Sequence, residues 1–167
     1  PEVLIEMPAY WHYIDAPEKV VPADNVEVRF AANATDLLHD LNHANNAHTL
    51  EQLQKWAALC GASADKGYEN RLYFWQYVVN YNNNGIFPSM YHYGNDFALC
   101  QSAGVDGWFA EQESCINTDF WDMKLWLITK QMENPVSGSE YQALMDEFLN
   151  GYYGAAGPYV KQYLDYM

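Results

Sequence analysis

The sequence predicts an α/β fold with about four parallel strands and helices between them. Four short apolar runs, at residues 3–13, 26–32, 72–79 and 105–110, alternate with stretches of helical character. This order, with strands that are continuously apolar, is typical of a parallel sheet. The 167 residues are enough for a single domain with its own core. A complete (β/α)8 barrel of the TIM type needs about 250 residues, so four strands are near half of one.

The first half of the chain should hold two strands and a long loop. Residues 3–13 predict a buried strand that ends in polar aromatic residues. Residues 26–32 predict the second strand, after a loop at 15–25 that contains two prolines. Residues 33–48 hold four Asn and three His and predict mainly a loop, with one helical turn at 36–41.

A helix should follow at residues 49–60. Thr49 is suited to cap its N-terminus, and Gln52, three residues later, would complete a capping box. Gly61 is the expected C-terminal stop, because glycine adopts the left-handed conformation that ends many helices.

The third strand, 72–79, shows the clearest alternation. Successive side chains of a strand point to opposite faces of the sheet. One face would carry Leu72, Phe74 and Val78, and the other Tyr73, Trp75, Tyr77 and Val79.

The second half should be mainly helical. We expect a helix at 89–103, then the fourth strand at 105–110, then a helix from the cap Thr118 to about residue 133. Residues 139–167 should form a C-terminal helical cap. Within it, Ser139 and Gln142 would form a second capping box, and Pro158 would stand in the first turn of the last helix.

The composition excludes two classes of partner. The chain carries 8 Lys and Arg against 22 Asp and Glu, a formal net charge of −14. Nucleic acids and anionic membranes both need a basic surface, so we expect neither as a partner. No apolar run reaches the roughly 18 residues of a membrane span. Aromatic residues make up 16 %, with 14 Tyr and 6 Trp, which indicates either an aromatic-rich core or flat rings that stack on sugars.

The sequence predicts no cofactor and no metal. Cys60, Cys100 and Cys115 are widely spaced, without a CxxC pair, and are best interpreted as buried free thiols. His39 and His43 stand four residues apart, the spacing of two metal ligands on one helix face. Hydrogen bonding within an Asn-rich loop is the interpretation that we favour for them.

Polar and aromatic residues gather where the predicted strands end. The carboxyl ends of parallel strands meet at one edge of a sheet, where α/β proteins bind their ligands. The candidate binding residues at this edge are Trp11, His12, Trp75, Tyr77, Asn80, Trp108, Glu111 and Glu113. Aromatic rings, amides and carboxylates together suit a carbohydrate ligand. For Trp75 packing inside a barrel is an equally good interpretation, and for Glu111 a structural hydrogen bond is a weaker alternative.

No pair of these carboxylates is suited to cleave a glycosidic bond. Glycosidases use two carboxyl groups that flank the bond, or one acid together with the acetamido group of the substrate. Glu111 and Glu113 follow the same strand and would lie on one side of a ligand. A proton donor is therefore expected outside these residues, and we predict no catalytic residue in the chain.

Four segments resemble a known family. They are residues 72–81 (LYFWQYVVNY), 87–90 (FPSM), 103–114 (AGVDGWFAEQES) and 146–167 (DEFLNGYYGAAGPYVKQYLDYM). They resemble domain-of-unknown-function family 4838, which is similar to glycoside hydrolase family 163, endo-β-N-acetylglucosaminidases that act on complex N-glycans. Family members are mostly bacterial and often exported, which suggests a periplasmic, cell-surface or secreted protein.

The resemblance implies the second half of a TIM-type barrel, strands five to eight. It also implies roles for four residues: Tyr77 with Asn80 would hold the acetamido group of a sugar, and Trp108 with Glu111 the innermost sugar. The chain would then be part of a glycoside hydrolase for N-acetylglucosamine-containing glycans, inactive alone. The alternative is a non-catalytic glycan-binding or assembly domain. Since a half-barrel leaves two free sheet edges, we expect self-association or pairing with a complementing N-terminal half.

Overall fold

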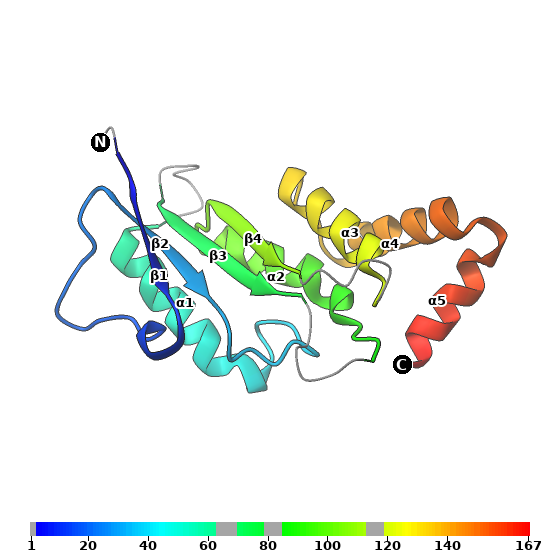
Figure 1. The fold of residues 1–167 in the computed structure, drawn as a ribbon, viewed down its shortest axis with the longest axis horizontal. Helices are drawn as coiled ribbons and strands as arrows, with labels where there is room; N and C mark the ends of the chain where they lie inside the picture. The colour runs from blue at the N-terminus through cyan, green and yellow to red at the C-terminus, as the bar shows by residue number, and fades with distance from the viewer. Residues whose placement is uncertain (1–2, 63–69, 79–84, 113–118) are drawn as a thin grey trace.

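Four parallel strands form a single sheet with helices beside it (Figure 1). The computed structural model describes residues 3–62, 70–78, 85–112 and 119–167. The strands lie side by side in chain order and pair in parallel; they are β1 (Ile5–Ala9), β2 (Val26–Ala31), β3 (Leu72–Tyr77) and β4 (Gly107–Glu111). This confirms the α/β fold with four parallel strands, while half of a barrel stays a prediction.

The helices form two groups. They are α1 (Ala47–Cys60), α2 (Tyr93–Ser102), α3 (Trp121–Glu133), α4 (Gly138–Tyr153) and α5 (Gly157–Tyr166), with short 3-10 turns η1 (Trp11–Tyr13), η2 (Ala44–Asn46), η4 (Ser89–His92) and η5 (Gly154–Ala156). Figure 1 shows α1 and α2 behind the sheet, and α3 to α5 beyond β4. One apolar cluster therefore joins α1 and the strands, and a second joins α2 to α3, α4 and α5.

The two faces of the sheet differ sharply. The face toward α1 and α2 carries buried apolar side chains such as Val28, Phe30, Leu72 and Phe74. The other face, which we call the open face, carries Glu6, Glu27, Arg29, Tyr73, Trp75, Tyr77, Phe109 and Glu111. Along Leu72–Val78 buried and half-buried residues strictly alternate, as predicted from the sequence.

The first strand is shorter and more exposed than predicted. It ends at Ala9, because Trp11 adopts a left-handed φ of 54° and begins the η1 turn. Val3, Leu4 and Ile5 are 69 %, 49 % and 56 % exposed, so a buried strand from residue 3 is wrong. Since β1 pairs only with β2 within the part of the chain that the structure describes, its outer edge is uncovered.

The N-terminal cap predicted for α1 is wrong, whereas its predicted C-terminal end is correct. The helix begins at Ala47, and Thr49 is buried inside its first turn. The side-chain oxygen of Gln52 accepts the Ala16 N–H instead of completing a capping box. Gly61 ends the helix in the left-handed conformation, with φ of 61°. The apolar pattern thus predicted the position of the helix but not its first two residues, Ala47 and His48.

The C-terminal helices show the same kind of shift. The helix expected at 89–103 is divided into η4 and α2. Helix α4 begins at Gly138 and continues to Tyr153, so a capping box at Ser139 is wrong. Pro158 stands in the first turn of α5, as expected. The predicted cap Thr118 lies outside the described residues.

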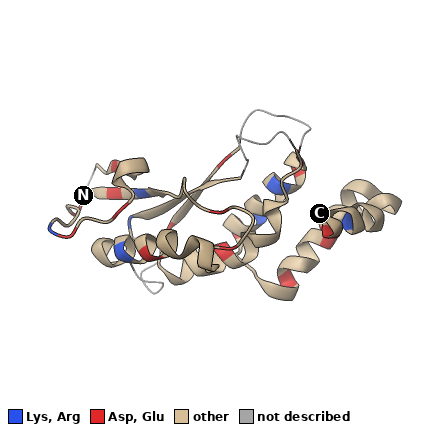
Figure 2. Cartoon of the chain, turned by 90° about the horizontal axis from the view of Figure 1, so that it is seen from below, with Lys and Arg blue, Asp and Glu red and all other residues tan. Residues whose placement is uncertain are grey.

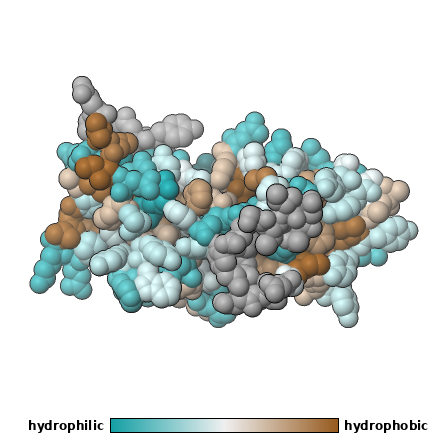
Figure 3. Space-filling view, in the orientation of Figure 1, coloured by the Kyte–Doolittle hydropathy of each residue, from teal (hydrophilic) through white to brown (hydrophobic). Residues whose placement is uncertain are grey.

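Charge and hydropathy are distributed unevenly over the surface. Acidic segments are spread along the chain with only scattered basic ones (Figure 2). Apolar side chains gather at the start of β1 (Figure 3), where Val3, Leu4 and Ile5 are exposed. None of the described helices combines the length and the apolar character that crossing a membrane requires.

Candidate functional site

A cleft of about 900 Å³ lies over the carboxyl end of the open face. All four strands or their carboxyl-terminal extensions contribute to it, together with residues 33–46, which we call the wall loop. Its lining residues are Glu6, Pro8, Tyr10, Trp11, Ala31, Asn33, Thr35, Asp36, Leu37, Leu38, Trp75, Tyr77, Phe87 and Glu111. The cleft therefore stands where parallel sheets place their ligands.

Trp75 and Glu111 form the centre of the cleft floor. The Trp75 indole Nε1–H donates to the Glu111 Oε2 at 2.7 Å. The Trp75 ring also packs against Phe109, with centroids 4.4 Å apart, because the two residues are paired in register. This bond fixes the orientation of the ring and places the Glu111 carboxylate beside it.

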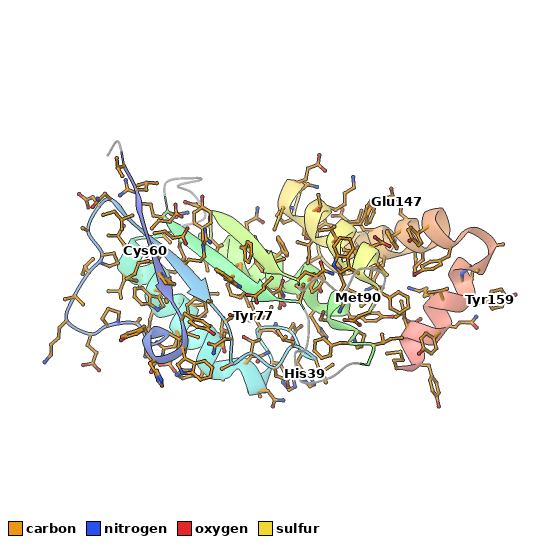
Figure 4. The ribbon with its side chains drawn as sticks, in the orientation of Figure 1. His39, Cys60, Tyr77, Met90, Glu147 and Tyr159 are labelled. Carbon is orange, nitrogen blue, oxygen red and sulfur yellow. The ribbon has the colours of Figure 1, made fainter. Side chains whose placement is uncertain are left out.

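Tyr77 continues the floor toward the end of β3 (Figure 4). It is the register partner of Glu111, and its hydroxyl is hydrogen-bonded to that of Tyr10. Burial, followed by the Glu111 charge, raises the pKa of Tyr77 well above its ordinary range. The phenol therefore stays protonated at neutral pH and can donate or accept.

Arg29 and Glu6 close the floor on the β1 side. The guanidinium Nη2 lies 2.5 Å from the Glu6 carboxylate. The Arg29 Cζ is also 5.6 Å from the centroid of Trp75, a distance suited to a cation–π contact. The Arg29 guanidinium on the open face is thus paired with an acid and an aromatic ring.

The wall loop is fixed by the side chains of Asp36 and Asn46. Asp36 Oδ2 accepts from Asn45 Nδ2 at 2.6 Å and from His39 Nδ1 at 2.9 Å. The buried Asn46 carboxamide binds the backbone of Asp36, His39 and Asp40. The hydrogen bond from Asn45 is the largest of the effects that lower the pKa of Asp36. This cleft carboxylate is therefore ionised at neutral pH.

An ion pair supports Phe87 at the far end of the cleft. Lys124 is fully buried, pairs with Asp119 and donates to the Val78 carbonyl at 3.1 Å. Asp119 in turn accepts the Phe87 N–H at 2.5 Å. This network connects the end of β3, the backbone of Phe87 and the start of α3. Burial lowers the pKa of Lys124.

The structure brings four of the eight predicted site residues together. Trp11, Trp75, Tyr77 and Glu111 all line the cleft. His12 packs beside Trp11, with ring centroids 5.9 Å apart, but does not line the cleft. Asn80 and Glu113 lie outside the described residues.

Trp108 lies on the opposite face of the sheet. It is paired with Phe74, and its ring stacks on Phe97 of α2 with centroids 3.8 Å apart. Side chains alternate along β4, so Phe109 and Glu111 point to the open face and Trp108 points to the core. The structure therefore does not group Trp108 with Glu111.

Several cleft residues were absent from the sequence-derived set. Glu6, Pro8 and Tyr10 are two residues apart along and just after β1 and all line the cleft. The two-residue repeat of a strand would therefore have placed them on one face. Asp36 stands in a loop, and only the folding of the wall loop over the sheet brings it to the cleft. Phe87 carries no sequence signal for this position.

The histidines and cysteines make local contacts. The His39 and His43 rings stack at 3.9 Å, with His39 bonded to Asp36 and His43 accepting the Asn45 N–H. Among the described residues no group of three His, Cys, Asp or Glu could hold a metal ion. Cys100 is a buried free thiol as predicted, whereas Cys60 is only half-buried and burial raises its pKa to about 11. Cys115 lies outside the described residues.

The cleft combines flat aromatic rings with fixed acceptors. Trp11, Trp75 and Tyr77 supply ring surface, and Glu111 and Asp36 supply carboxylate oxygens from two different elements. Such a set can accept hydrogen bonds from several hydroxyl or amide groups of one ligand.

A model of a protein family matches nearly the whole chain. The family model described as "Domain of unknown function (DUF4838)" matches residues 1–165. No curated protein and no solved structure matches the chain significantly.

Proposed function

The chain belongs to the DUF4838 family, whose description assigns no function, and we propose that it forms one wall of the substrate site of a glycoside hydrolase. The substrate class is a glycan that contains N-acetylglucosamine. In this proposal the sheet is the second half of a TIM-type barrel. The acetamido oxygen of the glycan attacks the anomeric carbon, and an acid outside these residues protonates the leaving sugar, as in substrate-assisted retaining hydrolysis.

The arrangement of Trp75, Glu111 and Tyr77 is the observation that carries the proposal. The indole ring is held by its bond to Glu111 and contributes to the surface of the cleft. Glu111 and the protonated Tyr77 phenol are register partners, so a carboxylate and a hydroxyl group stand beside that surface. A pyranose ring has apolar C–H faces and polar edges, which this combination matches. The net charge of −14 is compatible with a neutral ligand.

Two cleft carboxylates are poorly suited to be the proton donor. A general acid needs a raised pKa so that it is protonated at the working pH. The pKa of Asp36 is lowered, and Glu6 is paired with Arg29. Burial and the Glu6 charge do raise the pKa of Glu27, but Glu27 is not among the residues that line the cleft. These observations argue against Asp36 and Glu6 as the proton donor.

The experiment is a calorimetric titration of the chain with a complex N-glycan and with N,N′-diacetylchitobiose. We expect saturable binding that Trp75→Ala weakens by about two- to tenfold, since one aromatic contact is worth about 0.5–1.5 kcal/mol. Tyr159→Ala is the matched control, because Tyr159 is an exposed aromatic residue on α5, away from the cleft. Equal affinity of Trp75→Ala and the parent chain would reject the cleft as the binding site.

A non-catalytic glycan-binding or assembly domain is the second candidate. Asp36 is ionised and Glu6 is paired with Arg29, and both observations fit a domain without a catalytic acid as well as they fit a hydrolase whose acid lies elsewhere. The two candidates differ in the longer protein: binding together with turnover of a chromogenic N-acetylglucosaminide supports the hydrolase, and binding without turnover supports the second candidate. Turnover by residues 1–167 alone would show that the acid lies inside the chain.

A further inference from the structure

One wall of the cleft is held from behind by η4 and the first turn of α2. The ring of His92, the last residue of η4, is hydrogen-bonded to the backbone of Leu38. One turn later Asn95 Nδ2 donates to Asp40 Oδ2 at 3.0 Å. Leu38 lines the cleft, so these contacts bear directly on its shape.

Asp96 makes the third and most buried contact with the wall loop. It is 5 % exposed, and its Oδ1 accepts the Leu41 N–H at 2.8 Å. Its Oδ2 receives a long contact of 3.4 Å from Gln76 Nε2. The Gln76 Oε1 is buried and has no hydrogen-bond partner among the described residues. The Gln76 carboxamide beside Asp96 therefore turns its amide nitrogen to the carboxyl group, and its oxygen lacks a donor among the described residues.

Little room is left to hydrate this carboxyl group. Asp96, Gln76 and His92 border a cavity of only about 10 Å³, which Leu37 and His39 of the wall loop cover. A cavity of this size approaches the volume needed for one water molecule, whereas an ionised carboxylate needs several partners. An ionised Asp96 gains water most directly if the wall loop moves away.

We propose that Asp96 is a positioning residue of the cleft, which holds the wall loop against α2 while its carboxyl group is neutral and favours release of the loop once it ionises. The neutral group accepts the Leu41 N–H through one oxygen. Through the other it donates its proton to the Gln76 carboxamide oxygen, after a half-turn of that carboxamide. The proposal rests on the proposed function only for the kind of ligand that enters the cleft.

The groups around Asp96 support this assignment. On the wall loop, the negative charge of Asp40 repels a charge on Asp96, and His39 borders the same cavity as Asp96. From the helices, the neighbouring titratable groups are His92, Cys100, Tyr93 and Tyr141. Burial and then Asp40 raise the pKa of Asp96 to about 7, while the Leu41 N–H lowers it.

The sign of the pH effect follows from linkage. In the closed state Asp96 keeps its proton up to about pH 7, whereas a hydrated aspartate loses it near pH 3.8. Closing is therefore most favourable below about pH 4, weakens as the pH rises toward 7 and is weakest above 7. His92 acts in the opposite sense, because burial lowers its pKa and its protonation opposes closing.

The test is the hydrogen-exchange protection of the Leu41 amide, measured by NMR on the ligand-free chain and corrected for intrinsic exchange at each pH. Between pH 6 and 8 we expect protection to fall about tenfold, which corresponds to the loss of one proton per closed molecule. In Asp96→Asn this fall should vanish, since the amide side chain keeps the acceptor for Leu41 without titrating. Asp40→Asn is the control: it leaves Asp96 in place and should move the fall to lower pH.

Flat protection in the parent chain, or the same fall in Asp96→Asn, would overturn the proposal. If Asp96→Asn does not fold, the carboxyl carbon of Asp96 can be titrated in the parent chain. A midpoint near 7 shared with the Leu41 amide shift supports the proposal, and a midpoint near 4 rejects it. No glycan is used, so failure of the proposed function would leave this result unaffected.

Discussion

At the scale of single residues, position on the two-residue repeat of a strand decides which face of the sheet a side chain occupies, whatever the residue type. Trp75 and Trp108 are both strand tryptophans with aromatic neighbours. Trp75 faces the cleft and Trp108 faces α2, because their positions on paired strands differ by one place in the alternation. Alternation within 72–79 predicted the place of Trp75 and Tyr77. The same rule applied to β4 separates Trp108 from Glu111, which stand three places apart, and only the contact of Trp108 with Phe97 shows which of the two faces the core.

Lys124 gives a prediction at this scale. It is fully buried and pairs with Asp119, so removal of the cation leaves a carboxylate without its partner. We expect Lys124→Met to lower the free energy of unfolding by about 3 kcal/mol. Lys124→Met combined with Asp119→Asn should recover part of this loss, because the amide still accepts the Phe87 N–H. Urea denaturation measures both, and equal stability of Lys124→Met and the parent chain would contradict the importance of the pair.

At the scale of elements, apolar periodicity located the helices and strands, while their ends depended on distant side chains. The start of α1 was missed because Gln52 is used by Ala16 and Asn46 by the wall loop. Gly61 and Pro158 were predicted correctly because their effect on the backbone is local. Loop residues such as Asp36 could not be assigned to the cleft, since no local pattern shows where a loop folds back.

The sheet edges give a prediction at the element scale. Within the described residues β1 pairs only with β2 and β4 only with β3, and Ile5 on the outer strand is 56 % exposed. Free edges with apolar side chains favour pairing with another chain. Light scattering should therefore give a mass of at least twice 19.2 kDa. Ile5→Lys should shift the chain toward the monomer, and Tyr159→Lys should not; a monomeric parent chain would count against a half-barrel.

At the scale of the whole molecule, the sequence predicted the layers and the edge of the sheet where a site should lie. The four parallel strands and the position of the cleft over their carboxyl ends follow from alternating apolar runs. The open face was not predicted, because the sequence pattern does not show which side of a sheet the helices leave uncovered. On that face, Glu6, Arg29, Trp75 and Glu111 form a continuous polar and aromatic floor.

The central claim, that a glycan binds on the Trp75–Glu111 floor, is tested most directly by the indole N–H resonances. A titration of the ¹⁵N-labelled chain with N,N′-diacetylchitobiose should shift the Trp75 indole signal saturably, because its N–H is bonded to Glu111 in the cleft. The signal of the Trp108 indole, whose Nε1 is buried on the other face, should stay in place. A Trp75 signal that does not move at saturating glycan would contradict the account.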